Sequence, residues 1–224
     1  MRGHALSPSG AADLTVTTAT LASNGAPLHR PRADHFLGPS NSNGAVGGSF
    51  TVRLPDWAPL GIYRIRIGLH DNLRPALSEV VLRFAVEDRS LAAAASLEIR
   101  DFQLSSIRDG PPLPVSGPLL YGGGALYLRL RLFGVRFQGD QVKVRIGARL
   151  TGPGGNVVLD RPDWMEIGDR YEGHPANFFL PVRGELAAPA DLEKGIHTAT
   201  FTFTDDFSSA TVARQARFEA APGG

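Results

Sequence analysis

The residues best suited to chemistry are five acidic side chains that recur at every third position of one short stretch. They are Asp160, Asp163, Glu166, Asp169 and Glu172. Trp164 and Tyr171 lie in the same stretch, and an aromatic ring beside carboxylates can stack against a sugar while the acids bond its hydroxyl groups. The pattern suggests a loop over residues 160–172 that binds a carbohydrate or a cation, through Asp160, Asp163, Trp164, Glu166, Asp169 and Tyr171. The interpretation that we favour is a solvated hairpin anchored by one buried Trp.

A second pair of acids, Asp205 and Asp206, ends a run that has the pattern of a strand. Asp71-Asn72 ends another such run at an equivalent place. Carboxylates gathered at one end of a β-sandwich can bind Ca²⁺ through their oxygens, which makes Asp205 and Asp206 the candidate metal ligands and calcium the one candidate cofactor. Asp and Asn also cap turns by bonding their own backbone, and this interpretation is favoured, with Asp71 as a structural residue.

No catalytic motif is present in the sequence. The six histidines are scattered without a His-x-His pair, and there are no cysteines to complete a zinc set. Gly122–Gly124 precedes an apolar run but lacks the helix and the Gly-Lys-Ser/Thr of a phosphate loop, and no Gly-x-Ser-x-Gly elbow occurs. We therefore predict that the chain is not an enzyme and, calcium aside, needs no cofactor.

Charge and hydropathy exclude two classes of partner. Arginines lie on the outward faces of several predicted strands, at Arg64, Arg66, Arg129, Arg131, Arg145 and Arg149. Tyr127 and Phe133 interleave with them, as in a nucleic-acid groove. However, 23 basic residues are balanced by 22 acidic ones, so we predict no nucleic-acid binding. No apolar run approaches the roughly 18 residues of a membrane-spanning helix, so no membrane span is expected.

Alternation with a period of two residues dominates the chain. From Ile62 to His70, for example, apolar and polar residues alternate, as they do in a half-buried strand. The predicted strands, each bounded by Gly, Pro, Asn or Asp, are Leu14–Leu21, Ser49–Leu54, Ile62–His70, Glu79–Val86, Leu97–Leu104, Ala125–Phe137, Gln141–Leu150, Asn177–Val182, Ile196–Thr204 and Thr211–Glu219. No long segment has a helical period. The pattern therefore predicts an all-β fold.

An internal repeat divides the chain. Gly61–Phe84 aligns without a gap on Gly195–Phe218, and both segments share the same alternation. Upstream, the triplet ending at Leu21 resembles the triplet Ala148–Leu150, and the dipeptide Leu54-Pro55 resembles Leu180-Pro181. Two copies of one sandwich unit explain this pattern. The predicted domains are residues 1–88 and 97–224, with a linker at 89–96.

The two copies are unequal. The second has two strands, Leu97–Leu104 and Ala125–Phe137, before the shared part, where the first has only the polar residues 1–13. We predict that the first domain is incomplete, and that its missing strands come from upstream residues or from another chain by β-augmentation. A protein partner or self-association through its open strand edges is then expected. The alternative is a smaller sheet packed against the second domain.

The pattern that begins at Pro59-Leu-Gly61-Ile-Tyr63, alternates to Asp71-Asn72 and ends in Phe84-Ala-Val86 resembles immunoglobulin-like and fibronectin-III-like modules of bacterial envelope or secreted proteins. The resemblance implies consecutive Ig-like antiparallel β-sandwiches and a structural Tyr63 whose hydroxyl bonds upstream backbone. The second copy has His197 at that position, so the corner there is altered. The function that we expect is that of a non-catalytic structural or protein-interaction module in the envelope or outside the cell, although residues 1–10 do not form a secretory signal peptide. The alternative function is carbohydrate- or calcium-dependent ligand binding through residues 160–172.

Overall fold

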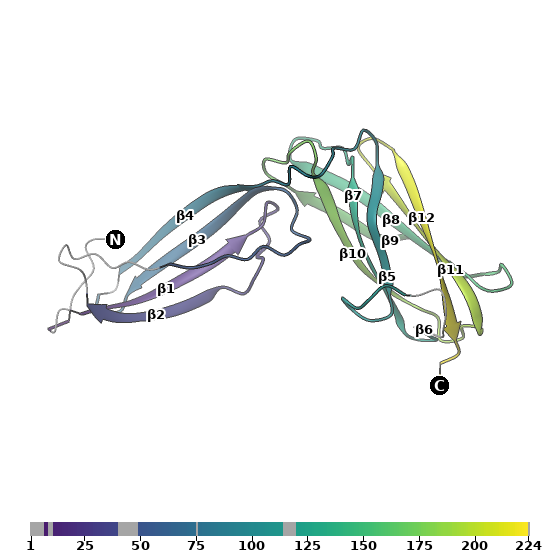
Figure 1. The fold of residues 1–224 in the computed structure, drawn as a ribbon, viewed down its shortest axis with the longest axis horizontal. Coiled ribbons are helices and arrows are strands. Elements are labelled where there is room, and N and C mark those ends of the chain that lie inside the picture. The colour runs from purple at the N-terminus through teal and green to yellow at the C-terminus, as the bar shows by residue number, and fades with distance from the viewer. Residues whose placement is uncertain (1–6, 9–10, 40–48, 75, 114–119, 224) are drawn as a thin grey trace. The chain divides into compact units, whose positions relative to one another are not determined.

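The computed structural model describes residues 7–8, 11–39, 49–74, 76–113 and 120–223 (Figure 1). Every regular element in these ranges is a β-strand, which confirms the all-β prediction. The chain divides into two compact units. Unit 1 consists of Met1–Glu87 and Tyr171–His174, and unit 2 of Asp88–Arg170 and Pro175–Gly224. The short segment 171–174 thus belongs to unit 1, which the predicted domain boundaries did not include.

Unit 2 is a sandwich of two sheets (Figure 1). One sheet has the order β10-β7-β5 and consists of Phe179–Ala187, Ala125–Phe133 and Glu98–Ser105. The other has the order β6-β12-β11-β8-β9 and consists of Leu120–Tyr121, Thr211–Ala221, Gly195–Asp205, Gln141–Thr151 and Val157–Arg170. In chain order these correspond to strands A, B and E of an immunoglobulin domain facing strands G, F, C and C′. Unit 2 is therefore an Ig-like β-sandwich.

Alternating side chains form the core of unit 2. Along β7 the leucines point inward and are at most 2% exposed, namely Leu126, Leu128, Leu130 and Leu132. They face the other sheet, in which the aromatic side chains of Phe201 and Phe203 on β11 are completely buried. Arg129, between two of the leucines, is exposed. The period of two read from the sequence is thus the period of burial across the sandwich.

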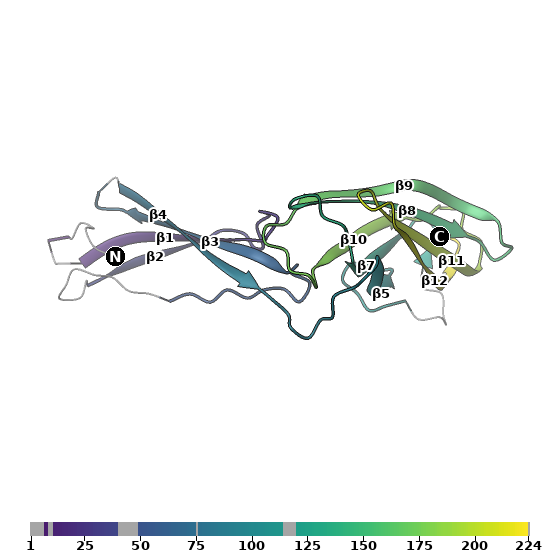
Figure 2. The same ribbon diagram turned by 90° about the horizontal axis from the view of Figure 1, so that it is seen from above.

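Unit 1 is a single antiparallel sheet with the order β2-β1-β3-β4 (Figure 2). The strands span Arg32–Pro39, Ala11–Leu21, Gly61–Asp71 and Ala76–Val86. This is the order of β9-β8-β11-β12 in unit 2. In the residues described here, unit 1 has no counterpart of β5, β7 or β10. What unit 2 has beyond unit 1 is therefore mainly a whole opposing sheet.

The register of strand pairing is also shared. Tyr63 pairs with Phe84 across β3 and β4, and the residues 134 positions later, His197 and Phe218, pair across β11 and β12. Each pair is in ring contact, with centroids 5.7 Å apart in both units. The ungapped alignment therefore superposes residues that occupy the same place in the sheet.

The upstream match made from sequence is wrong by one residue. It equated Ala19 with Ala148, but Ala148 pairs with Phe201 whereas Thr18 pairs with Ile67, the counterpart of Phe201. Thr18 is thus the equivalent of Ala148, and Ala19 faces the opposite side of its sheet. A shift of one residue moves every side chain of a strand to the other face, so the register depends on pairing that a local match does not contain.

Two predicted strands are corrected by the structure. Residues 49–54 alternate like a strand but form none, because they pair with no strand in the part of the chain that the structure describes. The strand predicted to reach Phe137 ends at Phe133, since Gly134 has a φ of 68° and turns the chain.

Candidate interaction surface

The sheet of unit 1 has one apolar face, the inner face, which is the side that carries Tyr63. Directly opposite residues of antiparallel strands share a face. The inner face therefore includes Leu14, Val16, Ile65, Ile67, Leu69, Val80, Leu82 and Phe84. The outer face carries charged residues, among them Arg64, Arg66, Glu79 and Arg83. Such a one-sided pattern is typical of a sheet that is buried on one side only.

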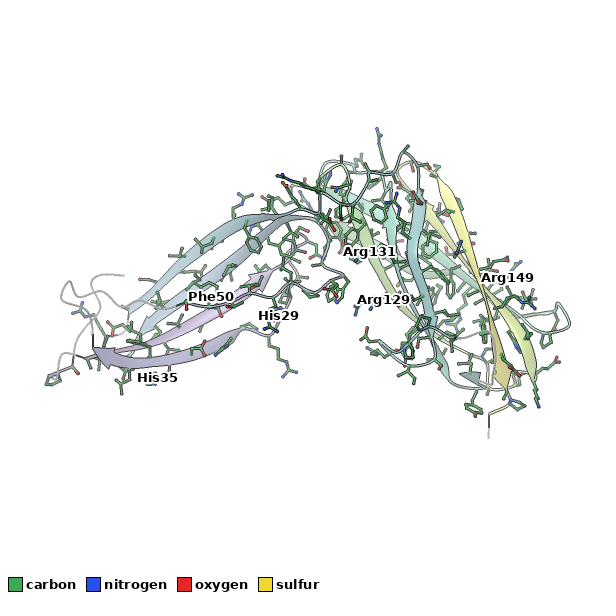
Figure 3. All side chains as sticks on the ribbon, viewed as in Figure 1. His29, His35, Phe50, Arg129, Arg131 and Arg149 are labelled. Carbon is green, nitrogen blue, oxygen red and sulfur yellow. The ribbon has the colours of Figure 1, made fainter. Side chains whose placement is uncertain are left out.

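Much of the inner face is accessible. In unit 2, Phe201 and Phe203 are completely buried by the opposing sheet. Their equivalents in unit 1, Ile67 and Leu69, are only partly buried. Phe50, labelled in Figure 3, precedes the segment that leads into β3 and is 47% exposed. Ile67 and Leu69 are thus shielded from water less than the residues at the same places in unit 2, whereas Leu14 and Tyr63 on the same face are buried.

Strand β4 is the most exposed apolar element of the unit. It is the last strand of its sheet, and four of its aliphatic side chains are 46–72% exposed, namely Leu77, Val80, Val81 and Leu82. At the positions equivalent to 80–82, β12 carries Arg, Gln and Ala at 214–216, and its C-terminal end pairs with β6. The edge of unit 2 at β12 is polar and partly covered, whereas the equivalent edge of unit 1 at β4 is aliphatic. A long apolar edge is a template for pairing with another strand.

The opposite edge of the same sheet is protected by charge. On β2, Arg32 and Asp34 form an ion pair with 2.8 Å between Nε and Oδ1, and both side chains are more than half exposed. His35, labelled in Figure 3, is 2.7 Å from Asp13. Charged side chains on an edge strand discourage pairing with another chain. The apolar edge at β4 is therefore the candidate interaction surface.

Tyr63 fixes the start of β3. It is completely buried, and its hydroxyl donates a 2.6 Å hydrogen bond to the carbonyl of Pro59. Ala22 and Ala58 are buried beside it, and burial raises the pKa of its hydroxyl above the ordinary value. His197, at the equivalent place in unit 2, has Nδ1 3.1 Å from the carbonyl of Gly195 instead.

Replacing Tyr63 by Phe should destabilise unit 1. The change removes the hydroxyl and leaves the carbonyl of Pro59 without this donor, which costs about 1–2 kcal/mol for a buried group. We expect the free energy of unfolding, measured in denaturant by Trp57 fluorescence in a Trp164→Phe background, to fall by that amount. Tyr121→Phe is the matched control, because Tyr121 is 59% exposed. Equal stability of Tyr63→Phe and the parent chain would rule out the anchoring role.

Glu172 neutralises two facing arginines of unit 1. Arg64 and Arg83 lie directly opposite each other on β3 and β4, where two like charges repel. The carboxylate of Glu172 accepts hydrogen bonds from both guanidinium groups. The backbone of the same residue accepts from the N–H of Ile62 at 2.9 Å and donates to the carbonyl of Ser23. Glu172, noted only as part of an acidic run, is therefore a structural residue of the outer face.

The predicted loop over residues 160–172 is wrong, because residues 160–170 belong to strand β9. Their partners are supplied by β8: Asp160 is 3.1 Å from Nε of Arg149, and Glu166 is 3.6 Å from Lys143. Figure 3 shows Arg149 on this sheet. Asp163 is exposed and Asp169 half-buried. Ligand binding by these acids remains a prediction, for a strand surface instead of a loop.

The two aromatic residues of that stretch belong to different units. Trp164 packs against the core ring of Phe201, with centroids 5.5 Å apart, and lies close to Gly184. Tyr171 is 2% exposed and belongs to unit 1, whereas Trp164 belongs to unit 2. Neither ring is therefore a free platform for a sugar. Trp164 is half-buried, so a buried Trp that anchors this stretch remains a prediction.

Asp205 and Asp206 point in different directions. Asp205 is completely buried and accepts hydrogen bonds from the N–H groups of Arg136, at 2.6 Å, and Phe207, and from the hydroxyl of Ser208. Asp206 is half-buried and lies 2.7 Å from Arg145, and this hydrogen bond holds the pKa of its carboxyl below the usual range. Among the described residues no three His, Cys, Asp or Glu side chains are grouped as a metal site.

Calcium should not stabilise the chain through Asp205 and Asp206. Ca²⁺ prefers six to eight oxygen ligands, and here one carboxylate is occupied by three donors while the other is paired with cations. We expect the melting temperature to be the same in millimolar calcium chloride and in magnesium chloride or EDTA. A saturable, calcium-specific increase that is lost in Asp206→Asn would show that the predicted metal ligands bind after all.

Five of the six outward arginines singled out from the sequence have acidic partners. The pairs are Arg64–Glu172, Arg66–Glu79, Arg131–Asp101, Arg145–Asp206 and Arg149–Asp160. Pairing of this kind cancels the local field that a nucleic acid would require. In the residues that are described, the structure holds no helix long and apolar enough to cross a membrane.

No family model matches the chain, and no curated protein matches it. Similar solved structures include fibronectin(III)-like modules of Clostridium thermocellum CbhA, with 12% identity, 92% of this chain and 78% of that chain covered, and a TM-score of 0.28. Another is the C-terminal domain of the Streptococcus agalactiae AgI/II polypeptide BspA, with 11% identity, 98% and 88% covered, and a TM-score of 0.34. Likenesses at this level carry no argument about function.

Proposed function

We propose that the chain is a non-catalytic structural or protein-interaction module, and that its first unit recognises a protein through the open part of its sheet. The observation that carries this proposal is the exposure of the apolar strand β4, where Val80 is 50% and Leu82 47% exposed. Burying such side chains against a partner is favourable, at roughly 25 cal/mol per Å² of apolar surface. An envelope or extracellular setting is part of the proposal, in keeping with the resemblance of Gly61–Tyr63 to modules of such proteins.

The proposal requires the apolar surface to be open in solution. The test is binding of the apolar dye anilinonaphthalene sulfonate to the full chain and to Val80→Arg/Leu82→Ala, which gives β4 the residues of β12 at positions 214 and 216. We expect several-fold less dye fluorescence from the double variant. Val157→Arg, which removes an equally exposed valine of unit 2, is the control and should leave the signal unchanged. Equal dye binding by all three would refute the proposal.

The same full chain can be used to distinguish the proposed function from the competing one, which is carbohydrate binding. A carbohydrate-binding module would be stabilised saturably by a glycan, and the effect would be lost in Asp163→Asn/Glu166→Gln, since both acids are exposed on β9. An interaction module shows no such stabilisation, and its melting temperature changes with a protein partner or with its own concentration. Saturable stabilisation by a glycan would replace the proposal with the ligand-binding one.

A further inference from the structure

We infer that the free edge of β4 pairs with β4 of a second copy of this chain, so that two unit 1 sheets join into one continuous antiparallel sheet. The inference rests on the proposed function, because it names the partner of the same surface. As the last strand of its sheet, β4 directs half of its main-chain N–H and C=O groups away from β3. A second strand satisfies these groups and covers the aliphatic side chains at the same time.

The sequence of β4 is complementary to itself when it is reversed. Residues 79–83 read Glu-Val-Val-Leu-Arg, with one acid and one base at equal distances from Val81. A two-fold axis through Val81 therefore places Glu79 opposite Arg83 of the second copy, and Arg83 opposite its Glu79. Opposite charges directly across an antiparallel pair are stabilising. The axis also satisfies the isologous rule, by which one patch contacts itself.

The same register sorts the side chains onto the correct faces. Glu79, Val81 and Arg83 lie on the outer face of each sheet, and Val80 and Leu82 lie on the inner face. Val80 is then opposite Leu82 of the second copy, twice, which extends the apolar inner face across the junction. A shift of two residues in either direction places Glu79 opposite Val81 or Ala85 and loses both ion pairs.

The charged pair is accessible in the single chain. The side chains of Arg83 and Glu79 are 58% and 48% exposed. Within unit 1, Arg83 bonds Glu172, and Glu79 lies 3.4 Å from Arg66. These contacts leave the outward edge of β4 open, whereas β12 carries Arg214 and Gln215 at the places of Val80 and Val81. The self-complementary edge thus belongs to unit 1 alone.

Disulfide cross-linking tests the position of the axis. The chain has no cysteine, so Val81→Cys introduces a single thiol that meets its own copy at the two-fold axis. Gln215→Cys, at the equivalent place on β12, is the matched control. Under mild oxidation we expect most of the Val81→Cys protein to become a disulfide-linked dimer, at least about tenfold faster than the control, because the bond requires Cα atoms within about 7 Å. The unmodified chain should dimerise reversibly in sedimentation experiments.

Charge reversal tests the register independently. Glu79→Arg alone places two arginines opposite each other across the axis, and Arg83→Glu alone places two glutamates there. Each variant should dimerise about tenfold more weakly than the unmodified chain. An equimolar mixture should recover dimerisation, because the mixed pair restores both ion pairs. Circular dichroism verifies that each variant is folded, and the cross-linking experiment does not depend on either of them.

The outcomes separate this inference from the proposed function. A chain that stays monomeric at every concentration, with Val81→Cys no faster to cross-link than Gln215→Cys, overturns pairing between copies. A dimer that forms but shows neither the cross-link nor the mixing effect overturns it as well. If dye binding still depends on Val80 and Leu82 in these cases, the proposed function stands and the partner is a different protein. If the dye difference is also missing, both fail.

Discussion

Replacing Phe201 by Ala is expected to lower the free energy of unfolding of unit 2 by about 3–5 kcal/mol, because it empties a fully enclosed space between two sheets. Ile67→Ala, at the equivalent place in unit 1, should cost clearly less, about 1–2 kcal/mol. Ile67 is partly exposed, so its removal loses less burial and leaves no closed cavity. The difference between the two variants reflects the cover that the opposing sheet gives at this position together with the larger size of the Phe side chain.

The two tryptophans make this comparison practical. Trp57 lies in unit 1 and Trp164 in unit 2, so the Trp164→Phe and Trp57→Phe backgrounds report one unit each in denaturant unfolding. Each loss is taken relative to its own background. A cost for Ile67→Ala as large as that for Phe201→Ala would show that the inner face of unit 1 is covered in solution, and it would contradict the open surface on which the proposed function depends.

The sequence predicted best those elements whose pattern is local. The strands around Tyr63 in β3 and along the leucines of β7 can be recognised from their alternation alone, because a strand that is buried on one face has a period of two residues. For the same reason the ungapped match between Gly61–Phe84 and Gly195–Phe218 found residues that occupy equivalent places. Both segments are a hairpin of two long strands, in which the turn length fixes the register.

Strands whose faces carry both polar and apolar residues were not predicted from the sequence. In β9 the acids Asp160, Asp163 and Glu166 appeared to mark a loop. They lie instead on a strand that pairs with β8, with bulges along the pairing. β2 is short and charged and ends in Gly-Pro, which is the composition of a protected edge and also that of a loop. Residues 49–54 show the reverse error, since an apolar alternation forms no strand without a neighbour. Pairing with a neighbouring strand decides each case.

The candidate surface was foreseen as an open edge, but its position was not. From the sequence we predicted that the first domain lacks its first strands. The described part of unit 1 lacks a counterpart of the whole β5-β7-β10 sheet. The signal that could have located the edge was already present. It is the contrast between Leu-Ser-Glu-Val-Val-Leu at residues 77–82 and Thr-Val-Ala-Arg-Gln-Ala at residues 211–216, in two segments that align without a gap. Leu77, Val80 and Val81 of the first copy stand where the second copy has the polar residues at 211, 214 and 215.

Asp205→Ala should be the most damaging single change at a polar residue of unit 2. Its carboxylate is completely buried and accepts hydrogen bonds from the backbone of Arg136 and Phe207 and from the hydroxyl of Ser208. Without it these donors stay buried and unsatisfied, and each costs roughly 1–3 kcal/mol. Partial relaxation of the hairpin reduces the sum, and we expect a loss of about 2–4 kcal/mol in denaturant unfolding followed by Trp164 fluorescence.

The neighbouring acid provides the control for this prediction. Asp206→Ala removes an ion pair with Arg145, whose side chain is about half exposed so that solvent weakens the interaction, and its effect should be far smaller. Asp71→Ala should destabilise unit 1 in the same manner as Asp205→Ala destabilises unit 2, because Asp71 accepts from the N–H of Leu73 at 3.0 Å in the equivalent turn. If Asp206→Ala proved as costly as Asp205→Ala, the stability of this hairpin would depend on surface charge instead of the buried carboxylate. Asp71 and Asp205 are then structural residues, each of the hairpin in its own unit, and their carboxylates are occupied by hydrogen bonds within that unit.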